Sequence, residues 1–164
     1  MPDMLRQFLA PRLSGRFLVR ATALACVTFA VGRWVLKPMR IEGASMEPTY
    51  AQRGFNLGNL LAYRWRAPRR GEVVLLRYGG ERWYLLKRVL AFAGENIEFR
   101  RGVCLVDGKP LDEPYVKLNA GWNVPPRKVA PGHVYVMGDN RGVPFEAHVG
   151  GEIAVARIAG RPLW

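Results

Sequence analysis

The stretch EVVLLRYGGERWYLLKRVLA, residues 72–91, decides the fold. Its two apolar runs, residues 72–77 and 82–91, are rich in the branched and aromatic side chains that favour β-strands. Residues 78–81, YGGE, supply a turn between them, so the stretch predicts a β-hairpin. Because side chains alternate along a strand, Lys87 shares one face of the second strand with apolar neighbours. Those neighbours are Trp83, Leu85 and Val89.

Four further short strands are predicted outside the hairpin, at residues 96–99, 103–106, 134–137 and 153–158. Turn residues separate them, namely Arg101-Gly102, Asp107-Gly108 and the proline-rich Val124-Pro125-Pro126. Short strands separated by such turn residues predict a mainly β fold, an antiparallel β domain. The 164 residues suffice for one core plus a tail, and no internal repeat divides the chain.

The N-terminal part contains a long apolar run, FLVRATALACVTFAVGRWVL at residues 17–36. Only residues 21–32 are free of charge, which is short for a membrane span and typical of a signal-peptide core or a buried helix. Arg20 and Arg33 can, however, extend to opposite headgroup layers, and Trp34 suits a membrane interface. We therefore expect one transmembrane signal anchor; a soluble core helix and a cleaved targeting peptide are the alternatives.

This reading divides the chain into a basic tail (1–16), the anchor (17–36) and an extracytoplasmic β domain (37–164). The arginines before the anchor slightly outnumber the cations after it, which favours an N-terminus inside the cell. We expect a single-pass protein of the bacterial cell membrane, with the mitochondrial inner membrane as the alternative.

The composition limits the partners and cofactors. Lys+Arg 25 against Asp+Glu 13 gives a net charge of +12, which suits nucleic acid or anionic lipid. The cations form no dense block, and no stacking-aromatic motif accompanies them, so we expect membrane lipid and no nucleic acid. Cys26 and Cys104 lie in different surroundings and predict no disulfide, and two histidines without a cysteine cluster predict no metal. No cofactor is expected.

The sequence EGASMEPT, residues 42–49, contains Ser45, one of only two serines in the chain. The other, Ser14, precedes the apolar run. A serine needs a nearby base and oxyanion donors to act as a nucleophile. Pro48 disfavours a helix starting at Ser45, which predicts an exposed loop or strand end. The non-catalytic alternative is a turn in which Ser45 bonds only its own backbone.

Lys87 is the candidate base. An ordinary lysine with a pKa of ~10.4 is neutral in about one molecule in 2500 at pH 7. Burial disfavours the ammonium, and a pKa of ~7 to 8 would make the amine an effective base. The apolar face of the predicted strand can sustain such a shift, although a lysine that extends to solvent is the alternative.

Five motifs in sequence resemble the type I signal peptidase family. They are SMEPT at 45–49, RGEVV at 70–74, KRV at 87–89 followed by AGE at 93–95, DGKPLDEPY at 107–115 and GDNR at 138–141. The resemblance runs from about residue 41 to the C-terminus. It implies a serine endopeptidase, a hydrolase that removes signal peptides from precursors with small residues before the cut.

By position, the resemblance makes Ser45 the nucleophile and Lys87 the general base of a Ser/Lys dyad. Met46 would form part of the floor of the substrate groove, and the main chain around Gly43, Ala44 and Ser45 would supply the oxyanion hole. Gly138 and Asp139 would form one wall of the site. The stretch 100–129 leaves little room for the extra β domain of some relatives.

The chain departs from the family pattern after residue 141. Pro144 stands where a hydroxyl would orient the lysine, and Glu146 and His148 replace an acid and an arginine. These two would form a pH-sensitive pair or lie in a solvated loop. A triad of Ser45, His148 and Asp139 is the alternative site, with His133 a polar residue at the start of a strand.

Three other functions are weighed. One is a dedicated maturation protease for a single precursor. Another is a self-cleaving repressor, which would need a DNA-binding helical domain that residues 1–40 are too short and too apolar to form. The third is a non-catalytic, membrane-tethered basic β domain that binds a partner.

Overall fold

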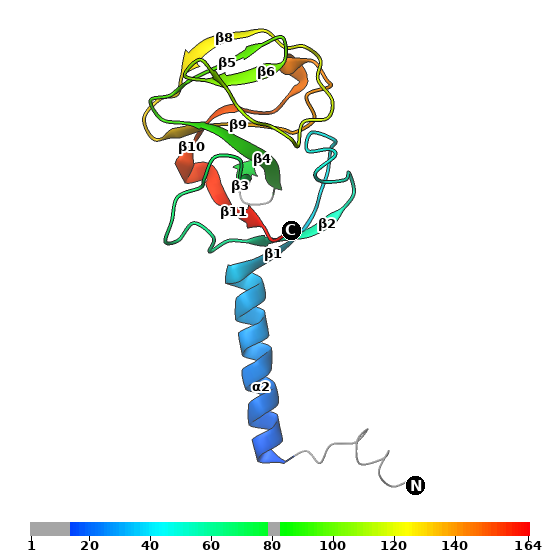
Figure 1. Cartoon of the computed structure of the whole chain (residues 1–164). Helices are drawn as coiled ribbons and strands as arrows, with labels where there is room; N and C mark the ends of the chain where they lie inside the picture. Colours follow the sequence, from blue (N-terminus) through cyan, green and yellow to red (C-terminus); the bar gives the residue numbers. More distant parts are fainter. Residues whose placement is uncertain (1–13, 79–82) are drawn as a thin grey trace. The chain divides into compact units, whose positions relative to one another are not determined.

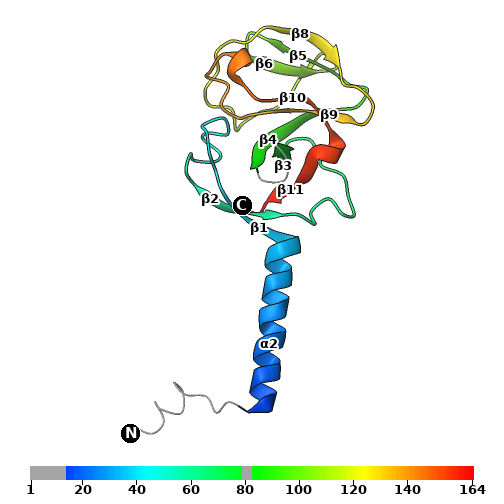
Figure 2. The same ribbon diagram turned by 180° about the vertical axis from the view of Figure 1, so that it is seen from behind.

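The structure, a computed structural model, describes residues 14–78 and 83–164. It consists of two compact units, one that ends at Leu36 and one from Lys37 to Trp164. Figures 1 and 2 show the elements of each unit from opposite sides.

The first unit is the predicted apolar segment, and it is helical. Helix α2 (Gly15–Ala30) continues into one π-helical turn, η1 (Val31–Val35). Ser14 caps the helix, because its side chain accepts a 3.2 Å hydrogen bond from the Phe17 main chain. The 21 residues Gly15–Val35 have a mean hydropathy of 1.4, and at ~1.5 Å per residue they are long enough to cross a bilayer. Residues 1–13 of the expected tail lie outside the described part.

The second unit contains two β-sheets. The larger sheet has seven strands in the order β1 (Leu36–Arg40), β2 (Phe55–Asn59), β11 (Ile158–Pro162), β3 (Val73–Tyr78), β4 (Trp83–Phe92), β9 (His133–Met137) and β10 (Gly151–Ala154). The smaller sheet has four strands in the order β7 (Lys109–Pro110), β6 (Val103–Val106), β5 (Asn96–Arg100) and β8 (Val124–Lys128). The prediction of a mainly β, antiparallel domain with one N-terminal apolar helix is confirmed.

The predicted hairpin is present as β3 and β4, which pair antiparallel with Val74 opposite Lys87. Of the predicted turn, residues 79–81 lie outside the described residues, and Tyr78 is the last residue of β3. The predicted strands at 96–99, 103–106 and 134–137 correspond to β5, β6 and β9.

Two predicted elements are wrong. Residues 153–158 do not form one strand: β10 ends at Ala154, a 3₁₀ turn η3 (Val155–Arg157) follows, and β11 begins at Ile158. The chain must break there because β10 pairs with β9, whereas β11 pairs with β3 and β2 across the same sheet. Val124-Pro125-Pro126 is not a separator but the start of β8. Prolines are tolerated there because β8 is an outer strand, as is β7 with Pro110.

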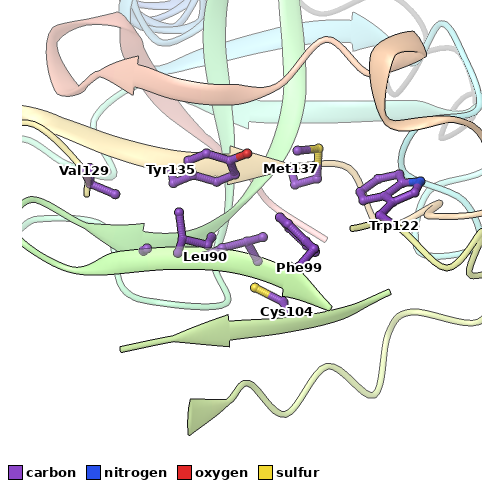
Figure 3. Close-up of a cluster of buried hydrophobic side chains, with 9 residues drawn as sticks. Leu90, Phe99, Cys104, Trp122, Val129, Tyr135 and Met137 are labelled. Carbon is purple, nitrogen blue, oxygen red and sulfur yellow. The ribbon is translucent and has the colours of Figure 1, made fainter. Parts of the chain in front are cut away.

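The main hydrophobic core lies between the two sheets (Figure 3). Leu90 of β4 and Tyr135 and Met137 of β9 pack there against Phe99 of β5 and Cys104 of β6. The alternate residues of β9, Val134 and Val136, belong to a different cluster on the other face of the large sheet. The large sheet is therefore buried on both faces around β4, the strand that carries Lys87.

A third cluster fixes the turn that carries Ser45. Met46, only 1% exposed, packs with Ile41, Leu75, Leu86 and Ala159. Because Met46, the residue after Ser45, is buried in this cluster, the position of Ser45 is fixed.

Candidate active site

Ser45 lies in a hydrogen-bonded turn between β1 and β2, and Lys87 lies in the middle of β4. The structure brings their side chains together: Lys87 Nζ donates a 2.8 Å hydrogen bond to Ser45 Oγ. Among the described residues this is the only hydrogen bond of the Lys87 amine. If the amine loses its proton, the same contact lets Oγ donate to Nζ, which is the geometry a general base requires.

The surroundings of Lys87 are dry. The side chain is 2% exposed, and its neighbours on the same strand face are the buried Val89 and the half-buried Leu85. Burial lowers the pKa of Lys87 to about 8, while the negative charge of Asp139 raises it to a smaller extent. About one amine in ten is then neutral at pH 7. Because the residue is buried, it does not extend into solvent, which was the alternative.

The Ser45 turn is held from residues 138–141. Asn140 donates its main-chain N–H to Ser45 O at 3.0 Å and its side-chain amide to Ala44 O at 3.1 Å. Gly138 lies so close that a Cβ built on it would be 2.2 Å from Ser45 O. The predicted wall at Gly138 and Asp139 therefore lies against the serine, and only glycine fits at the first of these positions.

Asp139 is fully buried and binds two elements of the site. It accepts hydrogen bonds from Arg88, at 2.8 and 2.5 Å, and from the Thr49 hydroxyl, at 2.6 Å. Arg88 follows Lys87 in β4, and Thr49 belongs to the Ser45 turn. One carboxylate thus ties the strand of the lysine to the turn of the serine.

The residues expected around the oxyanion lie beside Ser45. Gly43 has a positive φ of 86°, which favours glycine. It is exposed, and a Cβ built on it would meet no atom within 4 Å. No hydrogen bond from the Ser45 main-chain N–H is made within residues 14–78 and 83–164. That donor therefore remains available.

A small cavity of about 30 Å³ opens next to Ser45. Its lining comes from β1, the Ser45 turn and β4, and includes Ile41, Gly43, Met46, Tyr84, Leu85 and Leu86. The lining is mostly apolar, which suits a small apolar side chain of a bound peptide.

The alternative triad is not assembled. His148 has both ring nitrogens buried and without a hydrogen-bond partner among the described residues, so it bonds neither Ser45 nor Asp139. Its ring packs edge-on against Trp122, with centroids 4.7 Å apart. Of the two possibilities left open for Glu146 and His148, the pair is not formed, because Glu146 is exposed in the 3₁₀ turn η2 (Phe145–Ala147) and bonds no histidine nitrogen.

The pKa of His148 is lowered to about 4, mainly by burial and also by the positive charges of Lys87 and Arg141, against a smaller opposing effect of the Asn140 main chain. The imidazole is therefore neutral near pH 7. His133 begins β9, as expected for a polar residue at the start of a strand.

Several structural partners of the site were not singled out from the sequence. Arg88, Thr49 and Asn140 hold the two candidate catalytic residues, and they stand within or beside the KRV, SMEPT and GDNR motifs. Their places in these motifs are the signal that identifies them. Among the described residues, no group of three or more His, Cys, Asp or Glu side chains could hold a metal ion.

Comparison with known proteins places the chain in a family. The family described as signal peptidase, peptidase S26, matches residues 14–163. The probable signal peptidase I-1 of Synechocystis is 32% identical over 139 residues, which cover 80% of this chain and 71% of that protein. Signal peptidase I V of Bacillus subtilis is 31% identical over 135 residues, covering 74% of this chain and 80% of the relative.

A solved structure was also found, that of a signal peptidase I from Enterococcus faecalis V583. It has a TM-score of 0.46 and 22% identity, and the match covers 58% of this chain and 97% of that chain. On the sequence matches, this chain belongs to the signal peptidase (peptidase S26) family, and the resemblance of its five motifs is confirmed. It is therefore a peptidase, a hydrolase, and its N-terminal apolar helix fits a membrane-anchored protein.

Proposed function

We propose that this chain is a membrane-anchored serine endopeptidase that removes N-terminal signal peptides from exported precursors, with Ser45 as nucleophile and Lys87 as general base. The observation that carries the proposal is the 2.8 Å contact between Ser45 Oγ and a lysine amine that is 2% exposed. Membership of the signal peptidase family supports the same reaction, and it argues against the non-catalytic binding domain.

The reaction starts when neutral Lys87 takes the proton of Ser45 Oγ as this oxygen attacks the scissile carbonyl carbon. The carbonyl oxygen becomes an oxyanion, and the Ser45 main-chain N–H stabilises it. Gly43 has no hydroxyl to add, so further stabilisation comes from backbone donors near Ala44. The Lys87 ammonium then protonates the leaving amine, and an acyl-enzyme remains on Ser45.

Lys87, neutral again, takes a proton from a water molecule that attacks the acyl carbon. Collapse of the second oxyanion returns the proton to Ser45 Oγ and releases the signal peptide. In this proposal the small, mostly apolar cavity lined by Met46 and Leu86 receives a small side chain of the precursor, such as alanine.

Residues 17–36 cross the bilayer in this proposal, residues 1–16 stay in the cytoplasm, and residues 37–164 form the extracytoplasmic catalytic domain. The 21-residue apolar helix supports the span. The bacterial origin of relatives such as those from Synechocystis and B. subtilis favours a bacterial cell membrane over the mitochondrial inner membrane.

The test uses the full chain in phospholipid vesicles and a precursor with alanines at the first and third positions before the cut. Ser45→Ala and Lys87→Met should each lower cleavage by at least about 1,000-fold, while membrane association is kept. Ser14→Ala is the matched control, because Ser14 is the other serine and only caps helix α2. Cleavage that survives in Ser45→Ala, or loss confined to His148→Ala, would overturn the proposal.

A further inference from the structure

Residues 112–116, which follow β7, carry two side chains that contact arginines next to the candidate site. Glu113 accepts hydrogen bonds from the fully buried Arg141 at 2.6 and 3.4 Å. The ring of Tyr115 lies against the Arg88 guanidinium, with Cζ 3.8 Å from the ring centroid. The Tyr115 hydroxyl donates to Glu113 at 2.9 Å, so the two contacts form one connected structure.

Arg88 is the residue through which this contact can reach the dyad. Besides its two bonds to Asp139, its guanidinium donates to Gly71 O at 2.6 Å, and its side chain is only 11% exposed. Three groups, Asp139, Gly71 and Tyr115, therefore fix the guanidinium. The first two bind it through hydrogen bonds, and the Tyr115 ring adds a cation–π contact that is stronger for a desolvated cation.

The electrostatic consequence concerns Lys87. Asp139 is the charged neighbour that raises the pKa of the Lys87 amine, because a carboxylate favours the ammonium. Arg88 neutralises that carboxylate. When the guanidinium moves away from Asp139, more of the negative charge acts on Lys87, and the amine holds its proton more tightly.

We propose that Tyr115 is a positioning residue: its ring holds the Arg88 guanidinium against Asp139, so that Asp139 does not keep Lys87 protonated. The inference rests on the proposed role of Lys87 as the base. It assigns a task to the DEPY segment, which contributes nothing to the cavity beside Ser45.

Other titratable groups near Lys87 do not raise the pKa of its amine in the pH range of the assay. His148 is neutral, because its pKa lies near 4. Tyr50, which senses both Arg88 and Asp139, has a raised pKa and stays uncharged. Arg141 is paired with Glu113. A change at position 115 therefore alters how completely Arg88 neutralises the negative charge of Asp139.

The test measures kcat/KM against pH for the full chain in detergent micelles with a soluble fluorogenic peptide. Tyr115→Leu should move the acid limb of the profile to higher pH by roughly 0.5 to 1 unit and lower kcat/KM at pH 7 by about three- to tenfold. Tyr115→Phe keeps the ring and should leave the limb in place. Tyr78→Leu is the matched control, because it removes a tyrosine ring 6.0 Å from another arginine, Arg157.

A second series keeps the test decisive if Tyr115→Leu does not fold. Phenylalanines with increasing fluorination at position 115 keep the shape of the ring but remove the negative charge from its face, and the limb should rise with each step relative to Tyr115→Phe. An acid limb that stays in place through this series, or in folded Tyr115→Leu, overturns the inference. If the wild-type chain has no acid limb, or Ser45→Ala still cleaves, the proposed function itself fails.

Discussion

At the scale of one residue, the burial of Lys87 works against the stability of the fold. Its pKa of about 8 in the folded chain lies below the ordinary value of 10.5, because burial disfavours the ammonium. The unfolded chain therefore binds the proton more tightly, and the folded chain is destabilised wherever the amine is charged. This cost is fully present below pH 8 and disappears as the pH rises from about 8 to 10.5.

We predict that Lys87→Met raises the free energy of unfolding by about 2 to 3 kcal/mol at pH 7. Methionine fills a similar volume without a charge to desolvate. Chemical unfolding of wild type and variant, followed by circular dichroism in detergent, measures the difference. The gain should fall below about 1 kcal/mol at pH 10, where the wild-type amine is neutral. A variant less stable than wild type at pH 7 would contradict this account of burial.

In the proposed mechanism the same residue sets the pH dependence of cleavage. Only the neutral amine accepts the proton of Ser45, so kcat/KM should rise about tenfold per pH unit below pH 8 and level off above it. Steady-state cleavage of a soluble peptide between pH 6 and 10 checks the profile. A limb centred at pH 6.5 or below would instead indicate a histidine base.

At this scale Ser45 and Lys87, whose side chains are hydrogen-bonded, could be singled out from the sequence. A rare serine and a lysine on an apolar strand face can each be recognised without knowing which residues lie nearby in the fold. Thr49, Arg88 and Asn140 were not singled out. Their partners lie across the fold: Thr49 and Asp139 are 90 residues apart, and Arg88 and Asp139 are 51 apart. No local pattern reports such pairs.

At the scale of elements, the loop between β9 and β10 is sensitive to acid. It places His148 against Trp122 with both ring nitrogens buried. Because the pKa of His148 in the folded chain is about 4, against an ordinary value of 6.5, its contribution to stability is complete above pH 6.5 and is lost as the pH falls towards 4.

We predict that His148→Phe removes this part of the acid sensitivity. The ring remains, but nothing titrates, so the stability of the variant should fall less than that of wild type between pH 6.5 and 4. The difference should be about 1 to 2 kcal/mol, since the side chain as a whole is only half-buried. Unfolding midpoints of both proteins across this range give the result; parallel curves would contradict it.

Gly138 at the end of β9 makes a prediction of its own. A Cβ there would lie 2.2 Å from Ser45 O, so Gly138→Ala must displace the Ser45 turn. Activity should fall by about 100-fold or more, because a shift of this order misaligns Oγ and Nζ. Gly32→Ala, with no atom within 4 Å of its Cβ, is the control for the assay. Full activity in Gly138→Ala would show that the turn adapts.

The elements themselves were predicted where the pattern is local. The hairpin and the strands β5, β6 and β9 follow from alternation and turn residues. The break at residues 155–157 could not be predicted in this way, because it depends on which strands pair with β10 and β11 in the sheet. β8 was missed because prolines normally exclude a strand, and only its outer position makes them acceptable.

At the scale of the whole molecule, the chain separates into a helical unit and a β unit. We predict that a chain lacking residues 1–35 folds, with β-rich circular dichroism and cleavage of a soluble peptide within a fewfold of the full chain. Cleavage of a membrane-embedded precursor should fall by about 100-fold, because the anchor no longer concentrates enzyme and substrate in one membrane. Ser45→Ala in the full chain gives the background rate. Equal loss on both substrates would show that the helix is needed for folding.

The smaller sheet has a consequence for handling the protein. Both of its outer strands contain proline, Pro110 in β7 and Pro125 with Pro126 in β8. A proline has no N–H to offer to a strand of another molecule, so neither border is a good template for intermolecular sheet growth. Concentrated samples should therefore resist fibrillar aggregation through this sheet, and replacing Pro125 and Pro126 by valine should shorten the lag time of thioflavin-positive assembly.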